Sequence, residues 1–205
     1  MGGVAGHMSH LYEDLDLTFD TLRSILTEIS VGRVATTEKV DGINMFFSVD
    51  KSGQPVFARN KSDIKFGGQS LEEIRQTFSG HPAESPITEG CAAISRMLNF
   101  RTGMIFGTSG KNWANAEIIL AERPVSIRYS QNCIVLHGLK AFHPATGKPV
   151  HMDLSDRFAR LVENMEDTTG THDSAGWSCF GPIAVVLPNR SGTGTLAEAL
   201  RACRS

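Results

Sequence analysis

The chain has 205 residues, of which 40% are hydrophobic and 20% are charged. This composition is typical of a globular domain that can bury a core. The formal net charge is −2, so no overall basic field indicates a nucleic-acid-binding protein, although a local basic groove is compatible with it. No apolar run reaches the ~20 residues of a membrane helix, and the N-terminus lacks the pattern of a signal peptide. We therefore expect a cytoplasmic protein with no membrane partner.

The length predicts a single domain, which we place at 10–205, and the glycine-containing stretch at 1–9 is interpreted as a leader. The four cysteines lie far apart, with no Cys-x-x-Cys pair: Cys91, Cys133, Cys179 and Cys203. This spacing predicts neither a zinc site nor a disulfide framework. We expect small buried side chains in a reducing compartment.

The first predicted helix begins after Thr18, which is a good N-cap, and ends near Gly32. Three strand-like runs follow at 33–40, 43–49 and 55–60. The sequence Asp50-Lys-Ser-Gly53 predicts a hairpin between the second run and the third.

Downstream of the hairpin, residues 62–68 read as a polar loop. Ser70 and Glu73 form a capping-box pattern that predicts a helix to about residue 78. A second helix is predicted at 88–98, and residues 99–112 read as irregular.

The remaining elements follow from apolar periodicity and glycine positions. They are strands at 113–120 and 133–142, a short strand at 125–129, a helix at 153–165, a loop at 166–178, a strand at 180–187 and a helix from 192 to 203. Residues 146–205 suggest no known functional pattern.

The segment at 37–42, Thr-Glu-Lys-Val-Asp-Gly, is the most informative stretch. At the end of a strand, Lys39 and Asp41 share one face and would point into the same cleft. A lysine amine becomes a nucleophile when burial or nearby cations remove its proton. The alternative interpretation is an exposed β-turn that happens to carry these residues.

Arg59, Asn60 and Lys61 follow at the end of the third predicted strand. Their side chains are donors suited to phosphate or ribose oxygens, although charged residues also protect exposed edge strands. Glu117 interrupts an apolar run and is predicted to point into a cleft. It could equally lie on the solvent face of a half-buried strand.

These residues and their order resemble the covalent nucleotidyltransferase superfamily, which comprises ATP-dependent DNA ligases, RNA ligases and mRNA capping enzymes. Residues 37–42 look like its nucleotide-accepting lysine motif, in the style of RNA ligases. Residues 57–61 look like the second motif, 115–118 like the third, and 133–142 like the apolar strand that follows it.

Other stretches, at 12–14, 17–19 and 88–90, look like uncharacterised tailed-phage proteins regarded as ligases. The resemblance covers about residues 10–145. If the chain is encoded by a phage, its compartment is the host cytoplasm.

The resemblance implies an α+β nucleotidyltransferase (ligase adenylation-domain) fold, with antiparallel sheets around a nucleotide cleft and helices outside. It implies an enzyme in which Lys39 attacks the α-phosphate of ATP, with Mg²⁺ as cofactor, and AMP then passes to a 5′-phosphate end. The substrate would be RNA rather than DNA, or nicked duplex ends. No residues are assigned to the metal. The expected nucleotide-binding residues are Glu38, Asp41, Gly42, Arg59, Asn60, Lys61 and Glu117.

The chain departs from the family pattern in two places. The fourth motif, an acidic residue and glycine before an apolar strand, is not found after 133–142, and Glu89-Gly90 lies too early. The closing pair of lysines is also missing, because Lys140 and Lys148 lack its spacing. Two alternatives therefore remain: a nucleotide or nucleic-acid binding module without turnover, and a structural protein with a coincidental Lys-x-Asp-Gly.

Overall fold

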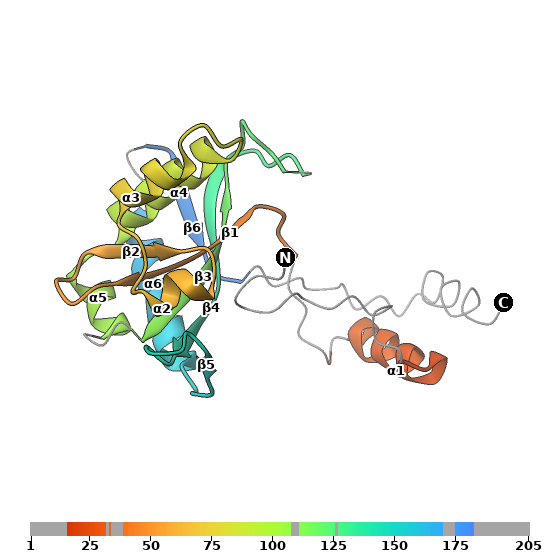
Figure 1. Cartoon of the computed structure of the whole chain (residues 1–205). Helices are drawn as coiled ribbons and strands as arrows, with labels where there is room; N and C mark the ends of the chain where they lie inside the picture. The colour runs from red at the N-terminus through yellow and green to blue at the C-terminus, as the bar shows by residue number, and fades with distance from the viewer. Residues whose placement is uncertain are drawn as a thin grey trace. The chain divides into compact units, whose positions relative to one another are not determined.

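The computed structural model describes residues 16–31, 33, 39–107, 111–125, 127–169 and 175–182. The chain divides into two compact units (Figure 1). Val40–Pro182 belongs to the first unit, and His7–Lys39 belongs to the second together with Ile183–Ser205. Three predicted segments fall largely or wholly outside the described residues: the strand at 180–187, the helix at 192–203 and the leader.

The helix of the second unit is α1, Phe19–Ser30. The Thr18 hydroxyl accepts a hydrogen bond from the Thr21 N–H at 3.1 Å, and Asp20 lies in the first turn, where the helix dipole favours an acid. The predicted helix and its cap are therefore confirmed. The next prediction, a strand at 33–40, is wrong at its described ends, because Arg33, Lys39 and Val40 are not in a strand.

The first unit is built on a sheet in which, among the described residues, the strands follow the order β2-β1-β3-β4-β5, with β6 also paired to β4 (Figure 1). All neighbouring pairs are antiparallel except β4 with β6. The strand bounds are β1 Ile43–Val49, β2 Pro55–Ala58, β3 Asn112–Ile119, β4 Asn132–Phe142, β5 Pro149–Val150 and β6 Trp177–Phe180. With its helices, this sheet confirms the α+β class.

The β1–β2 hairpin forms as predicted. The Asp50 carboxylate accepts hydrogen bonds from the backbone N–H groups of Ser52 and Gln54, and Gly53 takes a φ of 79° that other residues rarely adopt. Its second strand ends at Ala58, so Arg59 and Asn60 lie beyond the strand predicted for 55–60. Asn60 instead caps α2, Lys61–Lys65, within the segment predicted to be a loop.

One face of the sheet carries the main core. Met45, Phe47 and Val49 alternate along β1 and are buried there against four helices. These helices are α3 Leu71–Phe78, α4 Glu84–Met97, α5 Phe100–Phe106 and α6 Ser155–Thr169. The opposite face carries two smaller apolar clusters and the candidate site.

The predicted helices on the main-core face are confirmed, with shifted ends. The capping box of Ser70 and Glu73 opens α3. The helix predicted at 88–98 begins earlier, at Glu84, because Pro86 falls in its first turn, where the absence of an N–H costs nothing. The helix predicted at 153–165 continues to Thr169, into the segment predicted to be a loop.

Two other expectations are wrong. The segment predicted to be irregular contains α5, which Asn99 caps through a capping box with Thr102. No described residue between 125 and 129 forms the short strand expected there. Within the part of the chain that the structure describes, no helix is long and apolar enough to cross a membrane.

Candidate functional site

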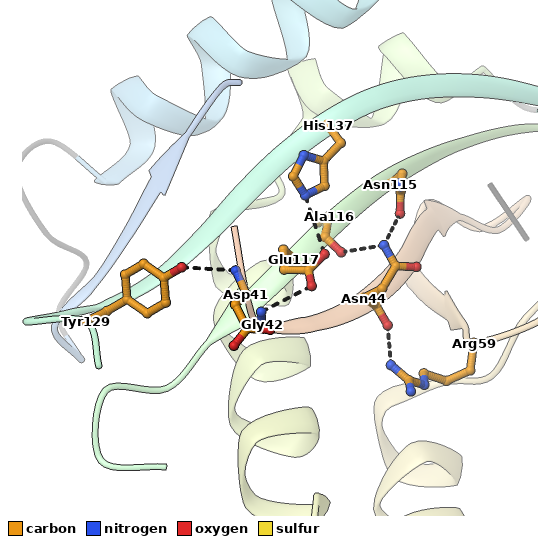
Figure 2. A network of polar contacts seen from close by, with 9 residues as sticks. All are labelled: Asp41, Gly42, Asn44, Arg59, Asn115, Ala116, Glu117, Tyr129 and His137. Carbon is orange, nitrogen blue, oxygen red and sulfur yellow. Dashed lines mark hydrogen bonds and ion pairs between the residues drawn. The ribbon is translucent and has the colours of Figure 1, made fainter. Parts of the chain in front are cut away.

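Polar side chains form a band across the face of the sheet opposite the main core. Trp113, Asn115, Glu117 and Ile119 share one face of β3 by strand periodicity. Trp113 belongs to one apolar cluster and Ile119 to the other, so the two polar residues lie between them. We call the group Asn44, Arg59, Asn115, Glu117 and His137 the polar band (Figure 2).

Glu117 links the band to the predicted lysine motif. Its Oε1 accepts a hydrogen bond from the Gly42 N–H at 3.2 Å, although the two residues are 75 positions apart. Asn44 lies directly opposite Glu117 in the β1–β3 register. Gly42, two residues before Asn44, therefore lies beside the Glu117 carboxylate. A Cβ at Gly42 would lie 2.5 Å from the Ile118 carbonyl oxygen and 2.8 Å from Glu117 Cγ. Only glycine permits this approach.

His137 reaches Glu117 because β4 is irregular at that point. Leu136 pairs with Ala116 and Gly138 pairs with Asn115, which leaves His137 as the extra residue of a bulge. Its Nε2 lies 3.4 Å from Glu117 Oε2. The side chains are 31% and 16% exposed, respectively, so the pair is partly accessible to solvent.

The centre of the band is an amide pair. The Asn44 Nδ2 donates to Asn115 Oδ1 at 2.6 Å and lies 3.4 Å from the Ala116 carbonyl oxygen. Asn115 is only 8% exposed, so its side chain needs this partner. The Arg59 guanidinium donates to the backbone carbonyl of Asn44 (Figure 2).

Arg59 is a partly buried cation. Burial lowers the pKa of its guanidinium, whereas interactions with Glu117, Cys91 and Asp63 act in the opposite direction. An arginine side chain stays protonated in proteins, so its charge is retained at a cost in solvation. Such a group favours an anionic ligand that would compensate its charge.

Asp41 is hydrogen-bonded to the connection between β3 and β4. Its N–H donates to the Tyr129 hydroxyl at 3.0 Å (Figure 2). Its Oδ2 accepts from the Ile127 N–H at 3.3 Å. Lys39, two residues earlier, is exposed. Residues 39–41 are in no strand, and Asp41 bonds to a loop rather than to a strand ladder, so the strand alternation expected to align Lys39 with Asp41 is absent there.

The other expected site residues have different surroundings. Asn60 is exposed, and its side-chain oxygen accepts from the Asp63 N–H at 2.9 Å as the N-cap of α2. Lys61 is the exposed first residue of that helix. Glu38 lies outside the described residues. The structure thus brings Gly42 into contact with Glu117, places Arg59 beside the Asn44 carbonyl, and bonds Asp41 to Tyr129.

Sequence reasoning did not select Asn44, His137 or Tyr129. An amide between Ile43 and Met45 in an apolar strand was a usable signal for Asn44, since it must have a partner there. A His-Gly pair inside an apolar strand was a signal of a bulge. Nothing local pointed to Tyr129, whose role depends on where a loop returns.

A small pocket lies beside this region, and a much larger one lies elsewhere in the first unit. Asp41, Gly42 and Tyr129 help line one of about 10 Å³, room for roughly one water molecule. A larger pocket of about 810 Å³ lies between the β1–β2 hairpin and the α4–α5 junction, and none of the expected site residues lines it.

The described cysteines, Cys91, Cys133 and Cys179, are free and buried, as expected. Cys203 lies outside the described residues. Among the described residues, no group of three or more His, Cys, Asp or Glu side chains is arranged to hold a metal ion. His7 and His10 lie outside that part of the chain.

Comparison with known proteins identifies no relative: no family model, no curated protein and no solved structure matches this chain.

Proposed function

We propose that the protein is a covalent nucleotidyltransferase of the ATP-dependent ligase type, with the polar band as its nucleotide-binding surface. One observation carries the proposal: the Gly42 N–H donates to the Glu117 carboxylate. One residue of the first motif therefore contacts one residue of the third motif in the resemblance to ligases. Lys39 lies three residues before Gly42, so chain geometry keeps their Cα atoms within about 11 Å of each other.

The charges of the band suit the parts of a nucleotide. Arg59 offers donors and a positive charge to a phosphate group. Glu117 Oε2, beside His137, can accept a hydrogen bond from a ribose hydroxyl. The flanking apolar cluster of Phe46, Trp113 and Phe142 adds a non-polar border.

In the first step, the Lys39 amine loses a proton to solvent and its Nζ attacks the α-phosphorus of ATP. A nitrogen–phosphorus bond forms, and the bond from that phosphorus to the oxygen bridging the β-phosphate breaks, releasing pyrophosphate. An oxygen of a 5′-phosphate end then attacks the phosphorus of this AMP, the nitrogen–phosphorus bond breaks, and the lysine nitrogen regains a proton. A 3′-hydroxyl finally loses its proton to solvent and attacks the 5′-phosphorus, and the bond from that phosphorus to AMP breaks, which joins the ends and releases AMP.

Magnesium is expected because nucleotide phosphates commonly carry it. The described residues offer no grouped carboxylate, histidine or cysteine ligands for it. We therefore assign no step to magnesium and include it in the assay as a counterion of the nucleotide.

The test is label transfer from α-³²P-ATP with magnesium, followed by a denaturing gel. We expect the wild-type chain to retain label and Lys39→Ala to fall to background, because alanine has no nucleophile. Lys39→Arg should also fail, since its guanidinium keeps its proton. Lys51→Ala, at an exposed position of the hairpin turn, is the matched control and should retain label. Equal labelling of wild type and Lys39→Ala would contradict the proposal.

The exposure of Lys39 favours one alternative, a module that binds nucleotide without transferring it, because a nucleophilic amine is normally desolvated. Calorimetric titration with ATP separates the two functions. Binding without label identifies the module, and its loss in Glu117→Gln would place the nucleotide on the polar band.

A further inference from the structure

We propose that Tyr129 is a positioning residue for Lys39, acting through the connection between β3 and β4. We call its described residues, 121–125 and 127–131, the strap. This inference rests on the proposed function and deepens it. The strap bonds to Asp41, two residues after Lys39.

Two hydrogen bonds at Asp41 run in opposite directions. Its backbone N–H donates to the Tyr129 hydroxyl (Figure 2). Its side-chain Oδ2 accepts from the Ile127 N–H. One bond holds the backbone of Asp41 and the other holds its side chain. These bonds join Asp41 to Tyr129 and Ile127, which lie 88 and 86 positions later in the sequence.

The strap is itself anchored to the sheet. The Tyr129 ring packs against the apolar cluster of Val40, Ile119, Cys133 and Val135. At the other end of the strap, the Ala121 N–H donates to Asn132 Oδ1 at 2.9 Å, which joins the end of β3 to the start of β4. Packing of the ring against this cluster therefore fixes the position of the Tyr129 hydroxyl.

Two observations indicate that Tyr129 positions the chain rather than binding nucleotide directly. Val40, the residue after Lys39, is only 5% exposed and lies in the same cluster as the tyrosine ring. The pocket beside Asp41 and Tyr129 holds about 10 Å³, which is too small for a nucleotide. The strap thus holds Val40 and Asp41 while the Lys39 side chain stays exposed.

Positioning of this kind affects rate more than affinity. In-line attack requires the nucleophile within about 3–3.5 Å of phosphorus, and small displacements lower the rate sharply. Tyr129→Phe retains the ring but removes the acceptor for the Asp41 N–H. We expect its single-turnover rate of label transfer at saturating ATP to fall roughly three- to tenfold, in proportion to one lost hydrogen bond. The Kd for ATP should stay unchanged.

The experiment measures that rate and the Kd in wild type, Tyr129→Phe and Ser95→Ala. The Ser95 hydroxyl donates to the Cys91 carbonyl within α4, so its loss is a matched removal of one hydroxyl on the other side of the sheet. A slower rate with unchanged Kd in Tyr129→Phe alone supports the positioning role. A rate equal to wild type, or a loss confined to the Kd, overturns that role and leaves the proposed function standing. Absence of label in the wild-type protein overturns both.

Discussion

At the scale of single residues, Gly42 shows how a backbone position can serve a site. Its N–H faces the Glu117 carboxylate, and its missing side chain leaves space that Ile118 and Ile119 occupy. A side chain there would push β3 away from the segment that follows Lys39. Glycine is required by this close approach, not by a turn of positive φ.

Gly42→Ala should destabilise the protein by about 1–3 kcal/mol, because the added methyl group meets backbone and must displace it. Label transfer should fall as well, since Glu117 would shift. Urea unfolding and the gel assay measure the two effects.

Gly103→Ala is the matched control, because a Cβ at Gly103 in α5 would meet no atom within 4 Å. It should be neutral or stabilising by up to about 1 kcal/mol, since alanine favours helix. If Gly42→Ala unfolds at the same urea concentration as wild type, the close approach is not as tight as described.

At the scale of elements, the caps explain where helices begin in this chain. The Ser70 N–H and hydroxyl both donate to the Glu73 carboxylate, at 2.7 and 2.9 Å, while the Glu73 N–H donates back to Ser70. These bonds lower the pKa of Glu73 because they stabilise its ionised form. The capping box therefore contributes fully only when the carboxylate is charged.

The stability that Glu73 contributes should be lost in acid. A group whose folded-state pKa is lowered stabilises the fold above its unfolded pKa, and this contribution disappears as pH falls through the folded value. The amide side chain introduced by Glu73→Gln does not titrate in this pH range. We expect wild type to exceed Glu73→Gln in urea midpoint at pH 7 and the difference to shrink towards pH 3.

Glu163→Gln, at an exposed position of α6, controls for the general removal of one carboxylate. A gap between wild type and Glu73→Gln that persists unchanged at pH 3 would mean that the ionised carboxylate is not what stabilises this cap.

At the scale of the whole molecule, the described thiols report on the integrity of the first unit. Cys91 lies in α4, Cys133 in β4 and Cys179 in β6, and all three are buried. Burial raises the pKa of each thiol, that of Cys133 to about 11. The reactive thiolate is therefore scarce at pH 8.

In a Cys203→Ser background, native protein at pH 8 should react with iodoacetamide far more slowly than urea-unfolded protein at each of these positions. Mass spectrometry of tryptic peptides gives the rate at each one. The rate at Cys133 should rise as pH approaches 11, because more of its thiol ionises. Rapid labelling of a single cysteine at pH 8 would show that the helix or strand carrying it opens while the rest of the first unit stays folded.

Much of the fold could be predicted from local signals. Apolar runs marked β1, β3 and β4, and the Ser70–Glu73 pattern marked α3 to within a residue. The short helices α2 and α5 were missed because each depends on an asparagine cap rather than on a long apolar stripe. Their residues alone are too few for periodicity to show.

The sequence by itself determined the α+β class and the chemistry available near Lys39 and Glu117, because residue types and strand patterns are local properties. Only the tertiary structure decided that Glu117 faces Gly42, that a bulge brings His137 beside it, and that Tyr129 returns to hold Asp41. The His137 contact depends on strand register, and the Gly42 and Tyr129 contacts close loops of 75 and 88 residues. Local preferences do not encode contacts between residues so far apart in the sequence. The partners meet only when the first unit folds as a whole.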